Sequence, residues 1–210
     1  MQENLVLLRN YLTHYNFMPK QLLSFLGALS PLDDAVYSDF LQALKLIQVP
    51  KGKLLLSEGE ICDRLWFVKT GLARGCFIIN HCSGKSQEIT EWFAVENDFF
   101  LAFESFVRQV PSREYIETLE PCQLIYISRK DLYHLYAKHP EICNLGRIIA
   151  ERFGLLDKER LREMRLHSAQ ERLNIFHQQS RELFLRVPQK YIASYLGISE
   201  NYVSKLKAKH

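Results

Sequence analysis

The chain has 210 residues, of which 47% are hydrophobic, and carries a formal net charge of +3. This length and apolar content allow one large or two modest globular domains. Because the sequence has neither an apolar run that could span a bilayer nor the basic start of a signal peptide, we expect a cytoplasmic protein with no membrane partner.

Five cysteines are scattered along the sequence, and no two of them form a Cys-x-x-Cys pair. An odd, scattered set favours reduced thiols over a disulfide framework or a zinc site. We therefore expect no bound metal.

Two kinds of periodicity divide the first two thirds of the chain. Apolar residues three and four positions apart predict short helices in the first forty or so residues, at 5–8, 22–26 and 37–41. From about residue 44 to 127, short runs of β-branched and aromatic residues alternate with glycine turns, which predicts an antiparallel β-barrel or sandwich. The expected strands include residues 65–69, 72–79, 87–93, 115–119 and 123–127.

Pro140 and Glu141 open a predicted helix of about 25 residues. Along it, apolar residues recur at spacings of three, four and near seven, which makes a stripe suited to another helix or to the β-domain. The stripe consists of Ile142, Leu145, Ile149, Phe153, Leu156 and Met164.

Two further helical signals follow. Ser168, with Glu171 three residues later, predicts a capping box that begins a helix ending near residue 181. Residues 187–207 then predict two short helices with a tight turn at Gly197, which is a helix-turn-helix. Pro188 and Ser199 suit the starts of these two helices. The small core between them is expected to contain Ile192, Ala193, Leu196, Ile198, Val203 and Leu206.

Charge and exposed side chains connect this helix pair with DNA. A plain helical hairpin in a core would satisfy the same apolar spacing, but it would bury donors and acceptors of the kind that read base edges and phosphates. Residues 141–210 also hold 13 Lys and Arg against 8 Asp and Glu, so the basic end of the chain carries the motif. The exposed polar residues are expected to be Glu200, Asn201, Ser204, Lys205 and Lys207.

Double-stranded DNA is therefore the expected partner. A lone helix-turn-helix commonly binds DNA as a symmetric pair. For this reason we interpret the apolar stripe of the long helix as the seam of a homodimer, with Gly146 admitting the partner backbone, rather than as packing on the β-domain.

The order of these parts, together with several motifs, resembles the Crp/Fnr family of bacterial transcription regulators across nearly the whole chain. The motifs are Lys51-Gly52, Glu58-Gly59, residues 63–71, Glu96-Asn97-Asp98-Phe99 and the helix-turn-helix, with Trp92-Phe93 and residues 186–193 especially similar to Crp-like proteins of Bacteroidetes. The resemblance implies an α+β fold in three parts. These are an N-terminal cyclic-nucleotide-binding-like β-roll with its helices (1–140), a dimerisation helix (141–167) and a helix-turn-helix DNA-binding domain (168–210).

The resemblance also implies how DNA is bound. A dimer would place its recognition helices in successive major grooves about 34 Å apart on a palindromic operator. Base reading would fall to Glu200, Asn201 and Lys205, whose groups suit cytosine, adenine and guanine respectively. The other expected DNA-binding residues are Gln189, Lys190, Ser199, Tyr202, Ser204 and Lys207. RNA polymerase is a further partner that the resemblance allows.

The expected effector pocket departs from the family pattern. Family members that bind cyclic AMP place Gly-Glu-Leu where this chain has Leu101, Ala102 and Phe103, and an arginine where it has Ser112, with Arg113 one position late. Losing that carboxylate and arginine forfeits charge-assisted hydrogen bonds of about 1.5–3 kcal/mol each. The sequence thus argues against cyclic AMP, and we assign no cofactor. The pocket residues would be Phe100, Leu101, Ala102, Phe103, Ser112 and Arg113.

Several alternatives stay open at this point. The aromatic residues around Phe100 suit either a less polar ligand or a collapsed core. No cysteine cluster near the N-terminus supports an iron–sulfur sensor, whereas His81 and Cys82 leave haem open.

The expected function is a non-enzymatic regulator, because no triad, paired carboxylates or phosphate loop has catalytic spacing. A different class is the alternative: a small-molecule-sensing or protein-interaction module with a degenerate helix-turn-helix. The short stretch between Arg181 and Val187, which leaves little room for a β-wing, favours that alternative.

Overall fold

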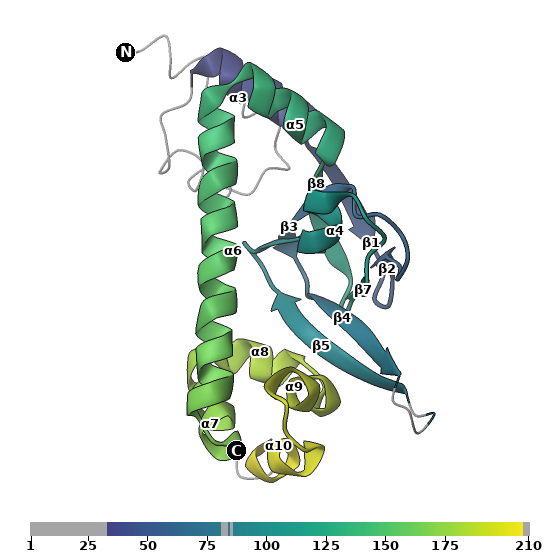
Figure 1. Cartoon of the computed structure of the whole chain (residues 1–210), viewed down its shortest axis with the longest axis vertical. Helices are drawn as coiled ribbons and strands as arrows, with labels where there is room; N and C mark the ends of the chain where they lie inside the picture. Colours follow the sequence, from purple (N-terminus) through teal and green to yellow (C-terminus); the bar gives the residue numbers. More distant parts are fainter. Residues whose placement is uncertain (1–32, 81–83, 85, 208–210) are drawn as a thin grey trace.

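The computed structural model describes residues 33–80, 84 and 86–207, with side chains through residue 204. The predicted helices at 5–8 and 22–26, like His81 and Cys82, lie outside this part. The elements, labelled as in Figure 1, are α3 (Asp34–Ala43), β1 (Lys45–Val49), β2 (Leu54–Leu56), β3 (Arg64–Thr70), β4 (Ala73–Asn80), β5 (Ser86–Ala94), β6 (Phe99–Phe100), α4 (Phe103–Arg108), β7 (Glu114–Thr118), β8 (Cys122–Ser128), α5 (Arg129–Lys138), α6 (Pro140–Leu166), α7 (Ala169–Gln179), α8 (Arg181–Arg186), α9 (Gln189–Leu196) and α10 (Glu200–Lys207).

The described strands form a β-roll of two four-stranded antiparallel sheets, which confirms the predicted antiparallel β-domain. One sheet has the order β1-β8-β3-β6 and the other has the order β2-β7-β4-β5. The five strands predicted from the sequence each agree with an observed strand to within one residue at either end. Both sheets contribute to one core, with Trp66 and Phe100 from the first and Ile116 from the second.

Alternation along β3 divides its side chains between two surroundings. Trp66 points between the sheets and stacks on Phe100, with ring centroids 6.1 Å apart. Leu65 and Phe67 point the other way, toward the helices α3, α5 and α6. A strand with apolar residues on both faces must be covered on both sides, and here the helices supply the second cover.

Helix α6 is 27 residues long, begins at Pro140 and runs along the whole molecule (Figure 1). The β-roll with α3 and α5 lies beside one part of it, and helices α7–α10 gather at its far end. No helix in the described ranges is both long and apolar enough to cross a membrane.

The apolar stripe of α6 packs on its own chain for much of its length. Ile142 and Leu145 are buried in the core of the β-roll, and Phe153 packs against that core. Gly146 admits the ring of Tyr136, since a Cβ at this glycine would lie 2.1 Å from the tyrosine hydroxyl. The interpretation of the stripe as a dimer seam is therefore wrong for these residues, because helical spacing shows which side is apolar but not what covers it.

The C-terminal helices follow the predicted signals. At the start of α7, the Ser168 hydroxyl accepts from the Glu171 amide and the Glu171 carboxylate accepts from the Ser168 amide, which is the predicted capping box. The stretch that is short for a β-wing forms the helix α8 instead. A second core holds these helices together, with Leu173, Phe184 and Ile192 among its buried residues.

Candidate DNA-binding surface and effector pocket

Helices α9 and α10 meet at a sharp turn where the helix-turn-helix was predicted. Gly197 ends α9 with a left-handed φ of 62°, a conformation that strains any residue with a Cβ. The Ile198 amide then donates to the Ala193 carbonyl at 3.0 Å, which closes the turn. Ile192 and Val203 are fully buried between the helices, so their crossing is set by a small packed core.

The polar face of α10 is uncovered. Glu200, Asn201 and Ser204 are exposed, and Tyr202 keeps 46% of its surface accessible. Beside them, Ser199 and Lys190 are exposed and Gln189 is half-buried, so these predicted DNA-binding residues lie on or next to one helix pair. Lys205 and Lys207 belong to α10, but their side chains lie outside the described part. This surface offers both donors and acceptors to a groove.

The six residues expected to form an effector pocket lie in different surroundings. Phe100, Leu101, Ala102 and Ser112 are buried, whereas Phe103 is 48% exposed and Arg113 is exposed. The Phe103 ring packs on Phe153 of α6, with ring centroids 6.1 Å apart. The Ser112 hydroxyl is engaged by the amide and carbonyl of Glu114, and its backbone pairs with Gly59 and Glu60.

Trp92 occupies the space between the sheets at this end of the β-roll. Its indole lies so close to Gly75 that a Cβ on this glycine would be 2.2 Å from the ring. The same ring lies 5.5 Å from that of Phe100, and its Nε1 donates to the Glu114 carboxylate at 3.3 Å. The sequence left two hypotheses open for the aromatic residues around Phe100, a site for a less polar ligand and a collapsed core. This arrangement agrees better with a packed core.

Carboxylates dominate the electrostatics beside Trp92. Burial, together with the nearby charge of Glu91, raises the pKa of Glu114 to about 7. Asp157 of α6 and Glu104 of α4 raise it further, and burial also raises the pKa of Glu91. Acidic side chains this close together disfavour further negative charge at this place.

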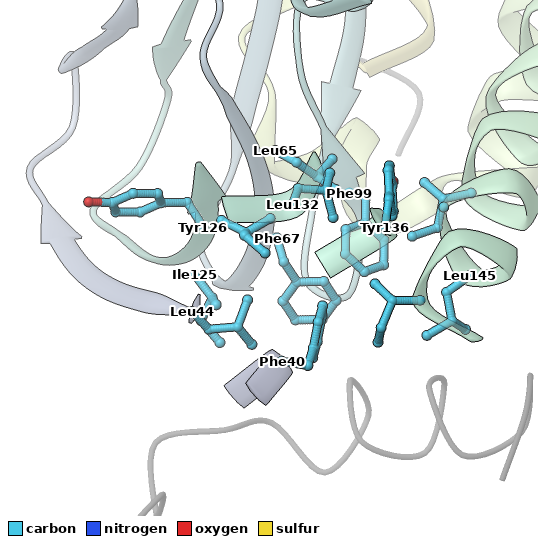
Figure 2. Close-up of a pocket in the computed structure, with 14 residues that line it drawn as sticks. Phe40, Leu44, Leu65, Phe67, Phe99, Ile125, Tyr126, Leu132, Tyr136 and Leu145 are labelled. Carbon is cyan, nitrogen blue, oxygen red and sulfur yellow. The ribbon is translucent and has the colours of Figure 1, made fainter. Parts of the chain in front are cut away.

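An apolar cavity of about 30 Å³ lies on the other face of the first sheet, between that sheet and α3, α5 and α6 (Figure 2). The rings of Phe40, Phe67 and Tyr136 line it, whereas the Tyr126 hydroxyl points away from it. Ligand pockets usually measure about 300–1,000 Å³. This cavity is therefore too small for an ordinary ligand and has the size of a packing defect.

Cysteines and metal ligands add no site in the described ranges. Cys62, Cys76 and Cys122 are free and buried, and Cys143 is free and exposed, in agreement with the predicted reduced thiols. Among the residues from 33 onward that the structure places, no group of three or more His, Cys, Asp or Glu side chains is arranged to hold a metal ion.

A contact between the C-terminal helices and the β-roll has no signal in the sequence. Arg186 of α8 forms ion pairs with Glu96 at 2.8 Å and Glu120 at 2.6 Å, two residues in the connections that follow β5 and β7. Ser194 of α9 bonds to the backbone of β5. Glu96-Asn97 and Glu120-Pro121 are visible as turn signals, but nothing in their spacing pairs them with an arginine 66 or more residues away.

Comparisons with known proteins agree with this architecture. Residues 46–139 match the model of the cyclic nucleotide-binding domain, a family that thus accounts for the β-roll and α5. Among curated proteins, the sequence finds no match.

Solved structures share the fold over most of the chain. FixK2 from Bradyrhizobium japonicum is similar with a TM-score of 0.67 and 16% identity, covering 79% of this chain and 83% of its own. A putative Crp/Fnr family regulator from Eubacterium rectale has a TM-score of 0.62 and 19% identity, covering 83% of this chain and 82% of its own. The c-di-GMP-responsive regulator CLP from Xanthomonas campestris has a TM-score of 0.60 and 16% identity, covering 84% of this chain and 93% of its own. At these identities the likeness establishes the fold, which is that of the Crp/Fnr transcription regulators.

Proposed function

We propose that this protein is a sequence-specific DNA-binding transcription regulator of the Crp/Fnr type, which binds a palindromic operator as a homodimer. In this proposal it has no catalytic activity, and its effector is absent or differs from cyclic AMP. The observation that carries the proposal is the uncovered polar face of α10, held at a fixed angle by α9 and Gly197. Buried hairpins do not keep such a face free of contacts.

Each polar residue has a role in this proposal. Glu200, Asn201 and Lys205 read base edges, while Gln189, Ser199, Tyr202 and Lys207 contact phosphates and so fix the register of the helix on the duplex. Lys190 and Ser204 flank these groups. The departure from cyclic AMP is supported by the filled interior beside Trp92 and by the carboxylates around Glu114.

Selection from random double-stranded DNA tests the proposal. The full chain, without any added ligand, is expected to enrich a palindrome with half-sites about one helical turn apart. A selection that enriches no sequence would contradict the proposal and favour a sensing or protein-interaction module. Adding cyclic AMP is expected to leave the enriched sequence and its yield unchanged.

The homodimer in this proposal uses a face of α6 that its own chain leaves open. Cys143, Ala150, Gly154 and Leu161 are exposed and recur at spacings of seven, four and seven, which places them on one side of the helix. A mid-helix glycine costs about 1 kcal/mol relative to alanine. A Cβ at Gly154 would meet no atom of the described chain within 4 Å, so packing inside the chain does not account for this glycine.

Replacing Leu161 tests this face. Leu161→Asp is expected to raise the dimer dissociation constant by about tenfold or more, because it buries a charge between two helices. Leu155→Asp is the matched control, since Leu155 is 61% exposed and lies about 120° around the helix. Analytical ultracentrifugation measures both. Equal dissociation constants for the two variants, or a wild-type monomer that stays monomeric on DNA, would contradict the assignment.

A further inference from the structure

The C-terminal helices and the β-roll share one hydrophobic core. Leu72 and Leu119 of the roll are buried in the same cluster as Leu173, Phe184 and Val187 of the C-terminal helices. Figure 1 shows α9 lying beside β5 of the roll. Domains joined by small polar interfaces move relative to each other by default, whereas a shared apolar core restricts that movement.

Arg186 forms a latch at one end of this contact. Its guanidinium makes two hydrogen bonds to each of two carboxylates, at 2.8 and 3.1 Å to Glu96 and at 2.6 and 3.1 Å to Glu120. Glu96 also accepts from the amide of Gly71 at 2.8 Å. Burial alone raises the pKa of Glu96, but the bonds from Arg186 and Gly71 outweigh it and keep the pKa below its usual value. Forked bonds of this kind fix orientation as well as distance.

A second attachment lies on β5. The Ser194 hydroxyl accepts from the Thr90 amide at 2.9 Å and donates to the Glu88 carbonyl at 3.0 Å. Arg160 of α6 donates to the Thr90 carbonyl at 3.4 Å and to the Tyr195 carbonyl at 3.3 Å. Two attachments on different parts of the roll prevent the C-terminal helices from rotating about either one.

The polar face of α10 stays exposed while both attachments are made. We propose that the latch holds α10 in the orientation in which a dimer reads its operator, so that this orientation is set by the fold and needs no effector. Arg186 is then a positioning residue for DNA recognition. This inference rests on the proposed function, because it assigns an operator to α10.

Hydrogen exchange on the full chain tests the latch without DNA. In wild-type protein, the Thr90 amide, which donates to Ser194, is expected to be protected although β5 is an edge strand. Arg186→Ala is expected to raise the exchange rate of this amide by about tenfold or more because undocking frees it, and Ser194→Ala should do the same by removing its acceptor. Arg186→Lys, which keeps the charge but loses the fork, should lie between wild type and Arg186→Ala. Arg181→Ala, at the exposed start of the same helix, is the matched control and should match wild type.

A panel of palindromes whose half-sites are moved apart in single base-pair steps tests positioning. Without added ligand, wild type is expected to prefer one spacing by about tenfold or more over its neighbours, because its two reading helices are fixed. Arg186→Ala should lose most of this preference while binding a single half-site as wild type does. A general loss of folding would instead weaken binding to the palindromes and to the single half-site alike. The control Arg181→Ala should behave as wild type in both measurements.

These experiments distinguish a failure of the latch from a failure of the proposed DNA-binding function. Unchanged exchange and unchanged spacing preference in Arg186→Ala, in a protein that selects a palindrome, would overturn the latch and leave the proposed function standing. A wild-type protein that binds its palindrome only after a ligand is added would also overturn it. If no DNA is selected although the Thr90 amide exchanges as expected, the proposed function fails, and the positioning role of Arg186 fails with it.

Discussion

The interior of the β-roll and the face of α10 differ in chemistry and packing. The interior beside Trp92 is aromatic, filled and bordered by carboxylates. The face of α10 is polar and exposed, and α10 follows α9 directly through the turn at Gly197. The first region is apolar with acidic neighbours, whereas the second exposes hydrogen-bond donors and acceptors.

The two regions therefore contribute differently to stability. A filled interior stabilises the roll through apolar burial, and it does so whether or not a ligand exists. An exposed polar face adds little to stability, so its groups can change without unfolding the chain.

Trp92→Ala is expected to have the largest effect. Removing a fully buried large aromatic side chain costs about 3–5 kcal/mol in the free energy of unfolding, because it leaves a cavity that neighbours fill only in part. Trp92 is half-buried against the core, so we expect a loss at the low end of this range. Urea denaturation measures the change, and added indole should recover part of it by occupying the cavity. Trp92→Phe should cost less than half as much. A loss below about 1 kcal/mol would show that the interior is not packed around this ring.

Lys205→Ala tests the reading face. The variant is expected to lose about 1–3 kcal/mol of affinity for the selected palindrome and to relax preference at one base position, because a base contact is removed. Lys207→Ala is the companion variant. It should weaken operator and random DNA alike and reduce the salt slope by about one unit. Equal losses on operator and random DNA for Lys205→Ala would contradict base reading.

Glu114→Gln tests the charge in the filled interior. Because the folded pKa of about 7 lies above the usual value, the protonated carboxyl stabilises the fold at low pH, and this stability is lost as the pH rises toward 7. The variant should therefore match wild type at about pH 5 and exceed it by about 1–2 kcal/mol at about pH 8. Chemical denaturation at both pH values measures this. A variant that is no more stable than wild type at the higher pH would show that Glu114 is not held in a charge-repelling site.

Much of the fold could be predicted because its signals are local. Turn glycines and runs of β-branched residues marked the strands, and Ser168 with Glu171 marked the start of α7. Pro140 marked the start of α6. In each case the residues that carry the signal are neighbours in the sequence, so the turn, strand or helix start that they favour does not depend on the rest of the fold.

The partners of each surface could not be predicted in the same way. The apolar side of α6 was visible, but whether Ile142 and Leu145 met a second copy or their own β-roll depended on the position of α5. The filled interior depended on Gly75 and Trp92, which are far enough apart in sequence that only strand pairing brings the indole over the glycine. The residues proposed to bind DNA lie in one short segment, α9 and α10, so their place on a common surface followed from local sequence.

The position of Ser194 has a consequence for the solubility of the chain. Strand β5 is the outer strand of its sheet, and a bare outer strand offers unpaired amides and carbonyls to any other strand that approaches. Helix α9 covers this edge at Thr90 and Glu88. A copy that loses its last helices to proteolysis would therefore expose a pairing edge rich in β-branched and aromatic residues, and such fragments should aggregate through strand addition even while their β-roll stays folded.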